Sequence, residues 1–170
     1  MNENENNQGN IDNTQTIQQP IVQQPQPSSL TDELAKLQDK WTSTIKELND
    51  QMKNLPSIDQ LMNEIYYKRQ EALDLYFGTN RVLAERTRDY KSKAAQIYLA
   101  LKSGQANLRF TNEQAITLQI ESRLVAEKET LDVMNNFVKF MEETVKTIDN
   151  IIFGINYKIK VHEMMNGLKF

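Results

Sequence analysis

Apolar residues recur at alternating spacings of three and four in the first well-patterned stretch of the chain. They are Leu34, Leu37, Trp41, Ile45, Leu48, Met52 and Leu55. This spacing is typical of a helix that packs along a coiled-coil seam. Thr31 is a suitable N-cap, and the acids Asp32 and Glu33 follow it at the positive end of the helix dipole. We therefore expect a first helix from Thr31 to Pro56, which ends it.

A longer helix is predicted after Pro56. Ser57 and Gln60 have the spacing of a capping box, which marks a helix start. The helix should continue to about Lys102, because Ser103-Gly104 is a stop signal. The Gly78-Thr79-Asn80 stretch weakens this helix, and a break or kink there is the alternative to a continuous one.

A third predicted helix carries the most regular pattern. Thr111 and Gln114 form another capping box, and Gly167 is a plausible stop. Between them an unbroken spacing of four and three joins Ile120, Leu124, Glu127, Leu131, Met134, Val138, Met141, Val145, Ile148, Ile152, Ile155, Ile159 and His162. Sustained heptads predict a helix that supercoils against partner helices.

The apolar face of this third helix is broad. Phe137, Phe140, Ile151 and Phe153 lie beside the seam and widen it. Because the two preceding helices of one chain would leave part of so wide a face uncovered, we expect a homo-oligomer. The residues expected to hold it together are Leu131, Met134, Val138, Met141, Val145, Ile148, Ile152, Ile155 and Ile159. An elongated monomeric bundle is the alternative.

The chain divides into a tail and a helical domain. Residues 1–29 are rich in Asn, Gln, Thr and Pro, as in "QQPIVQQPQPSS", and carry too little apolar area to offset the entropy of ordering. We expect a disordered tail, either a solubilising extension or a partner-binding arm. Residues 30–170 are expected to form an all-α domain of long antiparallel helices with coiled-coil heptads.

Few residues offer catalytic or metal-binding chemistry. There is no Cys and a single His, His162, and no glycine-rich phosphate loop. We expect no enzyme activity, no cofactor and no metal site, and we interpret His162 as a packing residue rather than a pH switch. Neither a signal peptide nor a stretch of about 20 apolar residues is present, so we expect a cytoplasmic protein without a membrane span.

Positive charge is concentrated in one stretch of an otherwise acidic chain. The net charge is −3, yet residues 68–109 carry nine basic and four acidic residues. At about 100° per residue, Arg81, Arg88, Lys91 and Lys102 fall on one flank of an apolar helical stripe. Arg86 and Lys93 fall on the other flank.

This charge has two interpretations. The side chains could be ordinary seam-flanking residues that pair with acids of neighbouring helices. Alternatively, they form a basic groove for phosphates, with Tyr90 or Tyr98 as surfaces on which bases stack. The groove would comprise Arg81, Arg86, Arg88, Lys91, Lys93, Lys102 and Arg109.

The stretch "SG…RFTNEQAITLQIESRLVAEKETLDVM…F" resembles phage recombination mediator proteins of the UvsY type. The matching residues are Ser103-Gly104, Phe110-Thr111, Glu113, Leu124, Ala126-Glu127-Lys128, Leu131, Phe140, Ile159 and Lys160. The resemblance covers roughly residues 60–166. It departs where that family carries a Lys/Arg pair shortly before the Ser-Gly, since Gln96 and Tyr98 stand there in this chain.

The resemblance implies a small helical protein that assembles into a ring. It also implies binding to single-stranded DNA, displacement of single-strand binding protein and loading of a phage RecA-like recombinase, hence roles in DNA recombination, repair and replication in a bacteriophage-infected cell. Because of the departure, the DNA contacts would fall on the basic residues named above. The alternative is a coiled-coil structural or assembly protein, such as a scaffold or virion component, with no nucleic-acid role.

Overall fold

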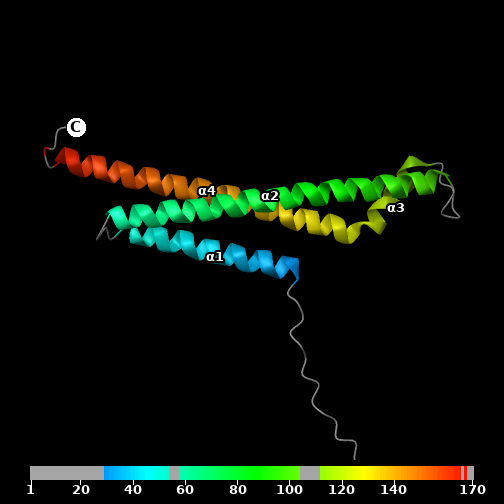
Figure 1. Cartoon of the computed structure of the whole chain (residues 1–170), viewed down its shortest axis with the longest axis horizontal. Helices are drawn as coiled ribbons and strands as arrows, with labels where there is room; N and C mark the ends of the chain where they lie inside the picture. Colours follow the sequence, from blue (N-terminus) through cyan, green and yellow to red (C-terminus); the bar gives the residue numbers. More distant parts are fainter. Residues whose placement is uncertain (1–28, 54–57, 104–111, 166, 168–170) are drawn as a thin grey trace, which may run out of the picture.

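A computed structural model describes residues 29–53, 58–103, 112–165 and 167, and these form an elongated bundle of four helices (Figure 1). The helices are α1 (Leu30–Gln51), α2 (Ile58–Ser103), α3 (Glu113–Arg123) and α4 (Val125–Met165). Within these ranges there is no strand, so the all-α prediction is confirmed. The long helices α2 and α4 run antiparallel, also as predicted (Figure 1). The predicted tail, apart from Ser29, lies outside the described residues.

Helix α1 begins one residue earlier than predicted, and Ser29 rather than Thr31 is its N-cap. The Ser29 hydroxyl accepts a hydrogen bond from the Asp32 backbone N–H at 3.2 Å. In return, the Ser29 N–H donates to the Asp32 carboxylate at 3.3 Å. This reciprocal capping box satisfies two backbone groups at once, which explains why the helix starts directly after Ser29. Its last residue is Gln51, before Pro56.

Helix α2 is continuous through Gly78, so the predicted continuous helix is confirmed and the alternative break is wrong. A Cβ atom added at Gly78 would meet no other atom within 4 Å. The glycine therefore lies on an open face, where its cost is that of intrinsic helix propensity alone. The helix ends at Ser103, one residue after the predicted end.

The predicted third helix is in fact two helices, and Leu124 separates them. Its backbone leaves the helical region, with φ −115° and ψ 23°. The turn lets α3 fold over the end of α2, where Ile116, Leu101 and Leu124 are all buried. Heptad spacing alone did not reveal this turn because Leu124 keeps its seam position while the helix axis changes direction. The predicted cap Thr111 lies outside the described residues, and Asn112 caps α3 instead.

Two neighbours cover different sides of α4, since α1 and α2 both pack on it. On the α2 side, Arg69 donates to Asp149 at 2.6 Å. On the α1 side, Met52 is the side chain nearest to Gly154. The predicted seam is therefore only part of the buried face of α4. A second buried row beside the seam consists of Phe137, Thr144 and Ile151. Phe137 and Ile151 were predicted to widen the apolar face, and only Thr144 was missed.

The burial corrects part of the predicted oligomer interface. Met134, Met141, Ile148 and Ile155 are at most 3% exposed, so one chain already covers them with its own helices. These side chains form the intrachain core and leave no surface for a second copy. The other predicted interface residues are partly buried and pack against that core: Leu131, Val138, Val145, Ile152 and Ile159.

Candidate nucleic-acid interface

Six of the seven predicted DNA-contacting residues lie exposed on α2, and Arg109 lies outside the described residues. Buried Leu83 and Leu101 mark the side of α2 that faces the bundle. At about 100° per residue, Arg88 lies about 140° and Lys91 about 80° around the helix from Leu83, so both lie on the same outer flank of α2. An outer row of Arg81, Arg88, Lys91 and Lys102 thus follows the helix for about 31 Å at 1.5 Å per residue.

Three of these cations pair with carboxylates. Arg81 pairs with Glu85 of the same helix at 3.3 Å. Lys93 pairs with Glu127 of α4 at 2.9 Å, and Lys102 with Glu113 of α3 at 2.5 Å. For Lys93 and Lys102 the interpretation of pairing with acids of neighbouring helices is thus confirmed, because tertiary packing brings Glu127 and Glu113 close to them.

The remaining three described cations are Arg86, Arg88 and Lys91. They are exposed and form no ion pair or hydrogen bond with any residue that the structure describes. Of the predicted DNA-contacting residues, three cations within six residues of α2 are therefore not engaged by another described side chain. Arg88 and Lys91 belong to the outer row, whereas Arg86 faces α4 across a pocket.

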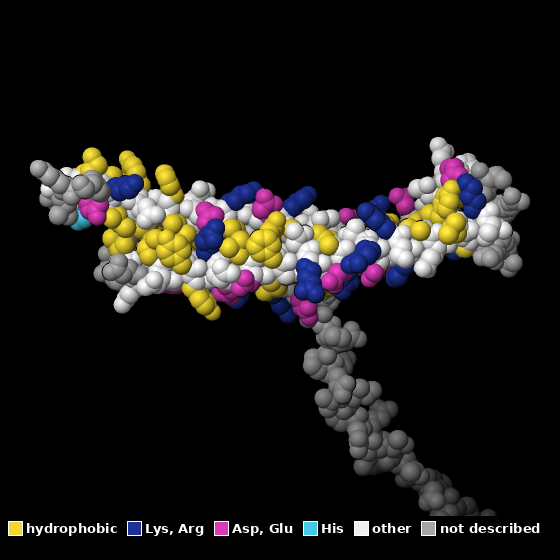
Figure 2. Space-filling model, turned by 45° about the horizontal axis from the view of Figure 1, so that its top comes forward, with side chains coloured by type: hydrophobic (Ala, Val, Ile, Leu, Met, Phe, Trp, Pro, Cys, Tyr) yellow, Lys and Arg dark blue, Asp and Glu magenta, His cyan; other side chains and the backbone are white. Residues whose placement is uncertain are grey.

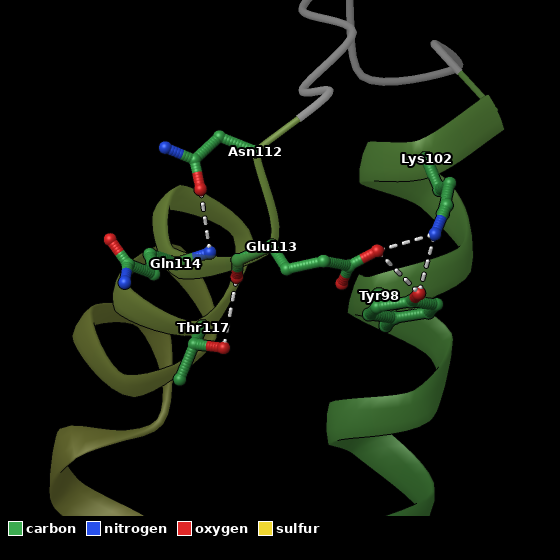
Figure 3. Close-up of polar contacts among 6 residues, drawn as sticks. All are labelled: Tyr98, Lys102, Asn112, Glu113, Gln114 and Thr117. Carbon is green, nitrogen blue, oxygen red and sulfur yellow. Dashed lines mark hydrogen bonds and ion pairs between the residues drawn. The ribbon is translucent and has the colours of Figure 1, made fainter.

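Lys102 and Tyr98 join the end of α2 to the start of α3 (Figure 3). The Lys102 ammonium donates to Glu113 Oε1 and also to the Tyr98 hydroxyl, at 2.8 Å, while that hydroxyl donates to Glu113 at 3.3 Å. The hydrogen bond from Lys102 lowers the pKa of Glu113, and the same bond raises the pKa of Lys102. Tyr98, predicted as a stacking surface, and Lys102 thus have a structural partner on α3.

A pocket of about 310 Å³ opens between α2 and α4. Its lining is Arg86, Asp89, Tyr90 and Lys93 from α2, with Ala126, Glu127, Thr130 and Leu131 from α4. The Lys93–Glu127 ion pair joins its two walls, and the hydrogen bond from Lys93 lowers the pKa of Glu127. Tyr90 is half-buried, so part of its ring remains available as a surface for stacking.

The surface carries mixed charge. On the face seen in Figure 2, basic and acidic side chains alternate along the bundle, and no broad single-sign patch forms. Among the described residues, no group of three His, Asp or Glu side chains could hold a metal ion. None of the helices in the described ranges has the length and apolar character that crossing a membrane requires.

An apolar stripe lies on the outer side of α4 near its C-terminal end. Phe153 is 74% exposed, Tyr157 63% and Met164 70%, with Val161 between them on the same face. The spacing of four, four and three residues aligns them on one side of the helix. Of these, the sequence pattern singled out only Phe153. The stripe Phe153, Tyr157, Val161 and Met164 is an apolar surface of α4 that the described helices leave exposed.

The chain was compared with protein-family models, with curated proteins and with solved structures, and no match was found in any of the three comparisons.

Proposed function

We propose that the protein is a non-enzymatic recombination mediator that binds single-stranded DNA and helps to load a RecA-like recombinase in place of single-strand binding protein. The observation that carries the DNA-binding part is the set of three unpaired, exposed cations Arg86, Arg88 and Lys91 on one helix. The mediator part rests on the resemblance to UvsY-type proteins.

The proposed mechanism is scaffolding, in which no bond is made or broken. Arg88 and Lys91 contact successive phosphates along the outer side of α2, and each contact releases condensed counterions. Arg86 approaches from the pocket side, beside the partly open ring of Tyr90. A strand held in this way is extended along the helix and presented to the recombinase.

Three cations per chain bind DNA weakly, so the proposal includes a homo-oligomer, such as a ring, that places several copies of α2 on one strand. The apolar stripe on α4 is the proposed contact between copies. Exposed aromatic and Met side chains of this size are typical of an interface and uncommon on the surface of a monomer.

Replacing Phe153 and Tyr157 together by serine is expected to lower the oligomeric mass, because the two largest side chains of the stripe are lost. Analytical ultracentrifugation over a range of concentrations measures this. The matched control is Tyr66→Ser with Leu99→Ser, since these α2 side chains are 50% and 66% exposed. A native protein that stays monomeric at every concentration, or an equal effect of both double variants, would contradict the proposed interface.

A coiled-coil structural or assembly protein without a nucleic-acid role is the second candidate. Of the eight described basic residues between 68 and 102, five form ion pairs: Lys68, Arg69, Arg81, Lys93 and Lys102. A structural protein without a nucleic-acid role would use its basic residues for such ion pairs within the bundle, so this pairing favours the second candidate.

Binding to labelled single-stranded DNA at increasing salt concentration separates the two candidates. If each chain neutralises about three phosphates, log K should fall with log[salt] with a slope of about −2 per chain. Oligomeric mass measured with and without the DNA shows whether several chains share one strand. Absence of binding at low salt would refute the DNA-binding function and leave the structural candidate.

A further inference from the structure

The pocket between α2 and α4 continues the groove that α1 occupies further along the bundle. Trp41 of α1 lines a second pocket together with Phe140 and Thr144 of α4. Ala126 precedes Phe140 by two heptads, and Thr130 precedes Thr144 by two heptads. Residues separated by whole heptads lie on the same side of a supercoiled helix. The α4 wall of the first pocket is thus the same face that α1 covers elsewhere.

We call the pocket between α2 and α4 the uncovered groove, because α1 does not extend over it. The N-terminal end of α1 lies at the mouth of this groove. Helices α1 and α4 run in the same direction in Figure 1, and Met52 lies against Gly154, an offset of 102 residues. The same offset places Ser29 at the level of Leu131, which lines the uncovered groove. The described part of the chain therefore begins, at Ser29, at the level of the groove.

The uncovered groove suits a polar, extended segment better than another apolar helix. Arg86 and Lys93 occupy the heptad position that Ala72 fills within the core, two and three heptads earlier. Glu127 occupies the position that Met134 fills one heptad later. An apolar helix docked here would bury these charges against hydrocarbon, which is costly. An extended segment with amide groups could hydrogen-bond to them instead.

The segment immediately before Ser29 has this chemistry. Residues 23–28 read QQPQPS. Pro25 and Pro27 oppose helix extension and favour the polyproline II conformation, at about 3.1 Å per residue. Three to four residues in that conformation span about 10 Å, enough to pass from the level of Leu131 beyond that of Ala126. Proline rings commonly dock on aromatic side chains, and Tyr90 supplies one.

We propose that residues 23–28 dock in the uncovered groove of the same chain, with prolines against Tyr90 and glutamine amides on Arg86 and Glu127. The occupant is this segment rather than a separate ligand, because covalent attachment at Ser29 gives it a local concentration in the millimolar range. The docked segment and a phosphate would compete for Arg86, whereas the outer row of cations on α2 stays open whether or not the segment is docked. The proposal does not depend on DNA binding.

Crosslinking in the full-length chain tests the docking. Because the chain has no Cys, two introduced cysteines are its only thiols. Gln26→Cys is combined with Thr130→Cys, which lines the groove. The matched control combines Gln26→Cys with Asp132→Cys, exposed only two residues further on and roughly 200° around α4 at 100° per residue. A short bismaleimide joins the thiols, and circular dichroism verifies that both variants are equally helical.

The variant with cysteines at positions 26 and 130 is expected to crosslink within one chain about tenfold faster than the variant with cysteines at positions 26 and 132. This ratio corresponds to a docking preference of about 1.4 kcal/mol. Adding Tyr90→Ala should reduce this difference. Equal rates for the two pairs would overturn the proposal, because they would mean that the segment samples both sides of α4. Crosslinks found mainly between two chains would also overturn it, because the groove would then hold a segment of another copy.

Discussion

Replacing Phe137 by alanine is expected to lower the free energy of unfolding by about 3–5 kcal/mol. Phe137 is 1% exposed and belongs to the buried row of α4 beside the predicted seam. The centroid of its ring lies 6.2 Å from the centroid of the Phe140 ring. Phe140 lies on the side of α4 that packs against α1. Truncation removes the aromatic burial and leaves a cavity that close-packed helices cannot fully close.

Urea denaturation followed by two signals measures the effect. Trp41 is the only tryptophan of the chain and is 1% exposed, so its fluorescence reports the packing of α1. Circular dichroism reports all helices. The matched control is Leu99→Ala, a side chain that is 66% exposed, which should change the free energy of unfolding by less than about 0.5 kcal/mol. Similar values for the two variants would mean that Phe137 is not in the core.

Replacing Arg88 and Lys91 together by alanine is expected to weaken binding to single-stranded DNA by about tenfold or more at low salt. Both side chains are exposed and unpaired within the described structure, so no internal ion pair competes with a phosphate for them. The loss of two phosphate contacts should also make the slope of log K against log[salt] shallower by about 1.4. Fluorescence anisotropy at several salt concentrations gives both quantities.

A control of equal charge is available on α1. Lys36 and Lys46 are exposed and form no ion pair with the described residues, so Lys36→Ala with Lys46→Ala changes the net charge by the same amount. This control should leave the DNA affinity nearly unchanged, and neither double variant should alter helicity or oligomeric mass. An equal loss of affinity in both would mean that net charge, not α2, determines binding. Loss of the oligomer in the α2 variant would instead assign Arg88 and Lys91 to the assembly.

Capping and stop signals predicted α2. The heptad pattern, with the apolar residues beside it, predicted every buried residue of α4 except Thr144. It was correct for Met134, Met141, Ile148 and Ile155 as inward-facing residues but wrong in assigning them to a contact between chains. Periodicity along one helix identifies which residues face a partner. It does not identify whether that partner is a helix of the same chain, because both kinds of neighbour require the same apolar spacing.

The candidate DNA-binding site was predictable in outline only. The sequence alone separated Arg88 and Lys91 from Arg86 and Lys93 on opposite flanks of α2, since helical geometry follows directly from residue spacing. It could not show which cations carry a partner. Glu113 and Glu127 are 11 and 34 residues away from Lys102 and Lys93 along the chain, so only folding brings them together.

Local interactions therefore determined the helices of this protein, their approximate ends and the sides on which apolar and basic residues lie. These properties depend on groups within about one turn of each other, and spacing in the sequence encodes them. The tertiary structure alone decided that the chain turns at Leu124 and that α1 and α2 share the face of α4. It also decided that Arg86, Arg88 and Lys91 form no ion pair with another residue of the described ranges. These properties depend on contacts between residues far apart in the sequence, and helical periodicity carries no information about such contacts.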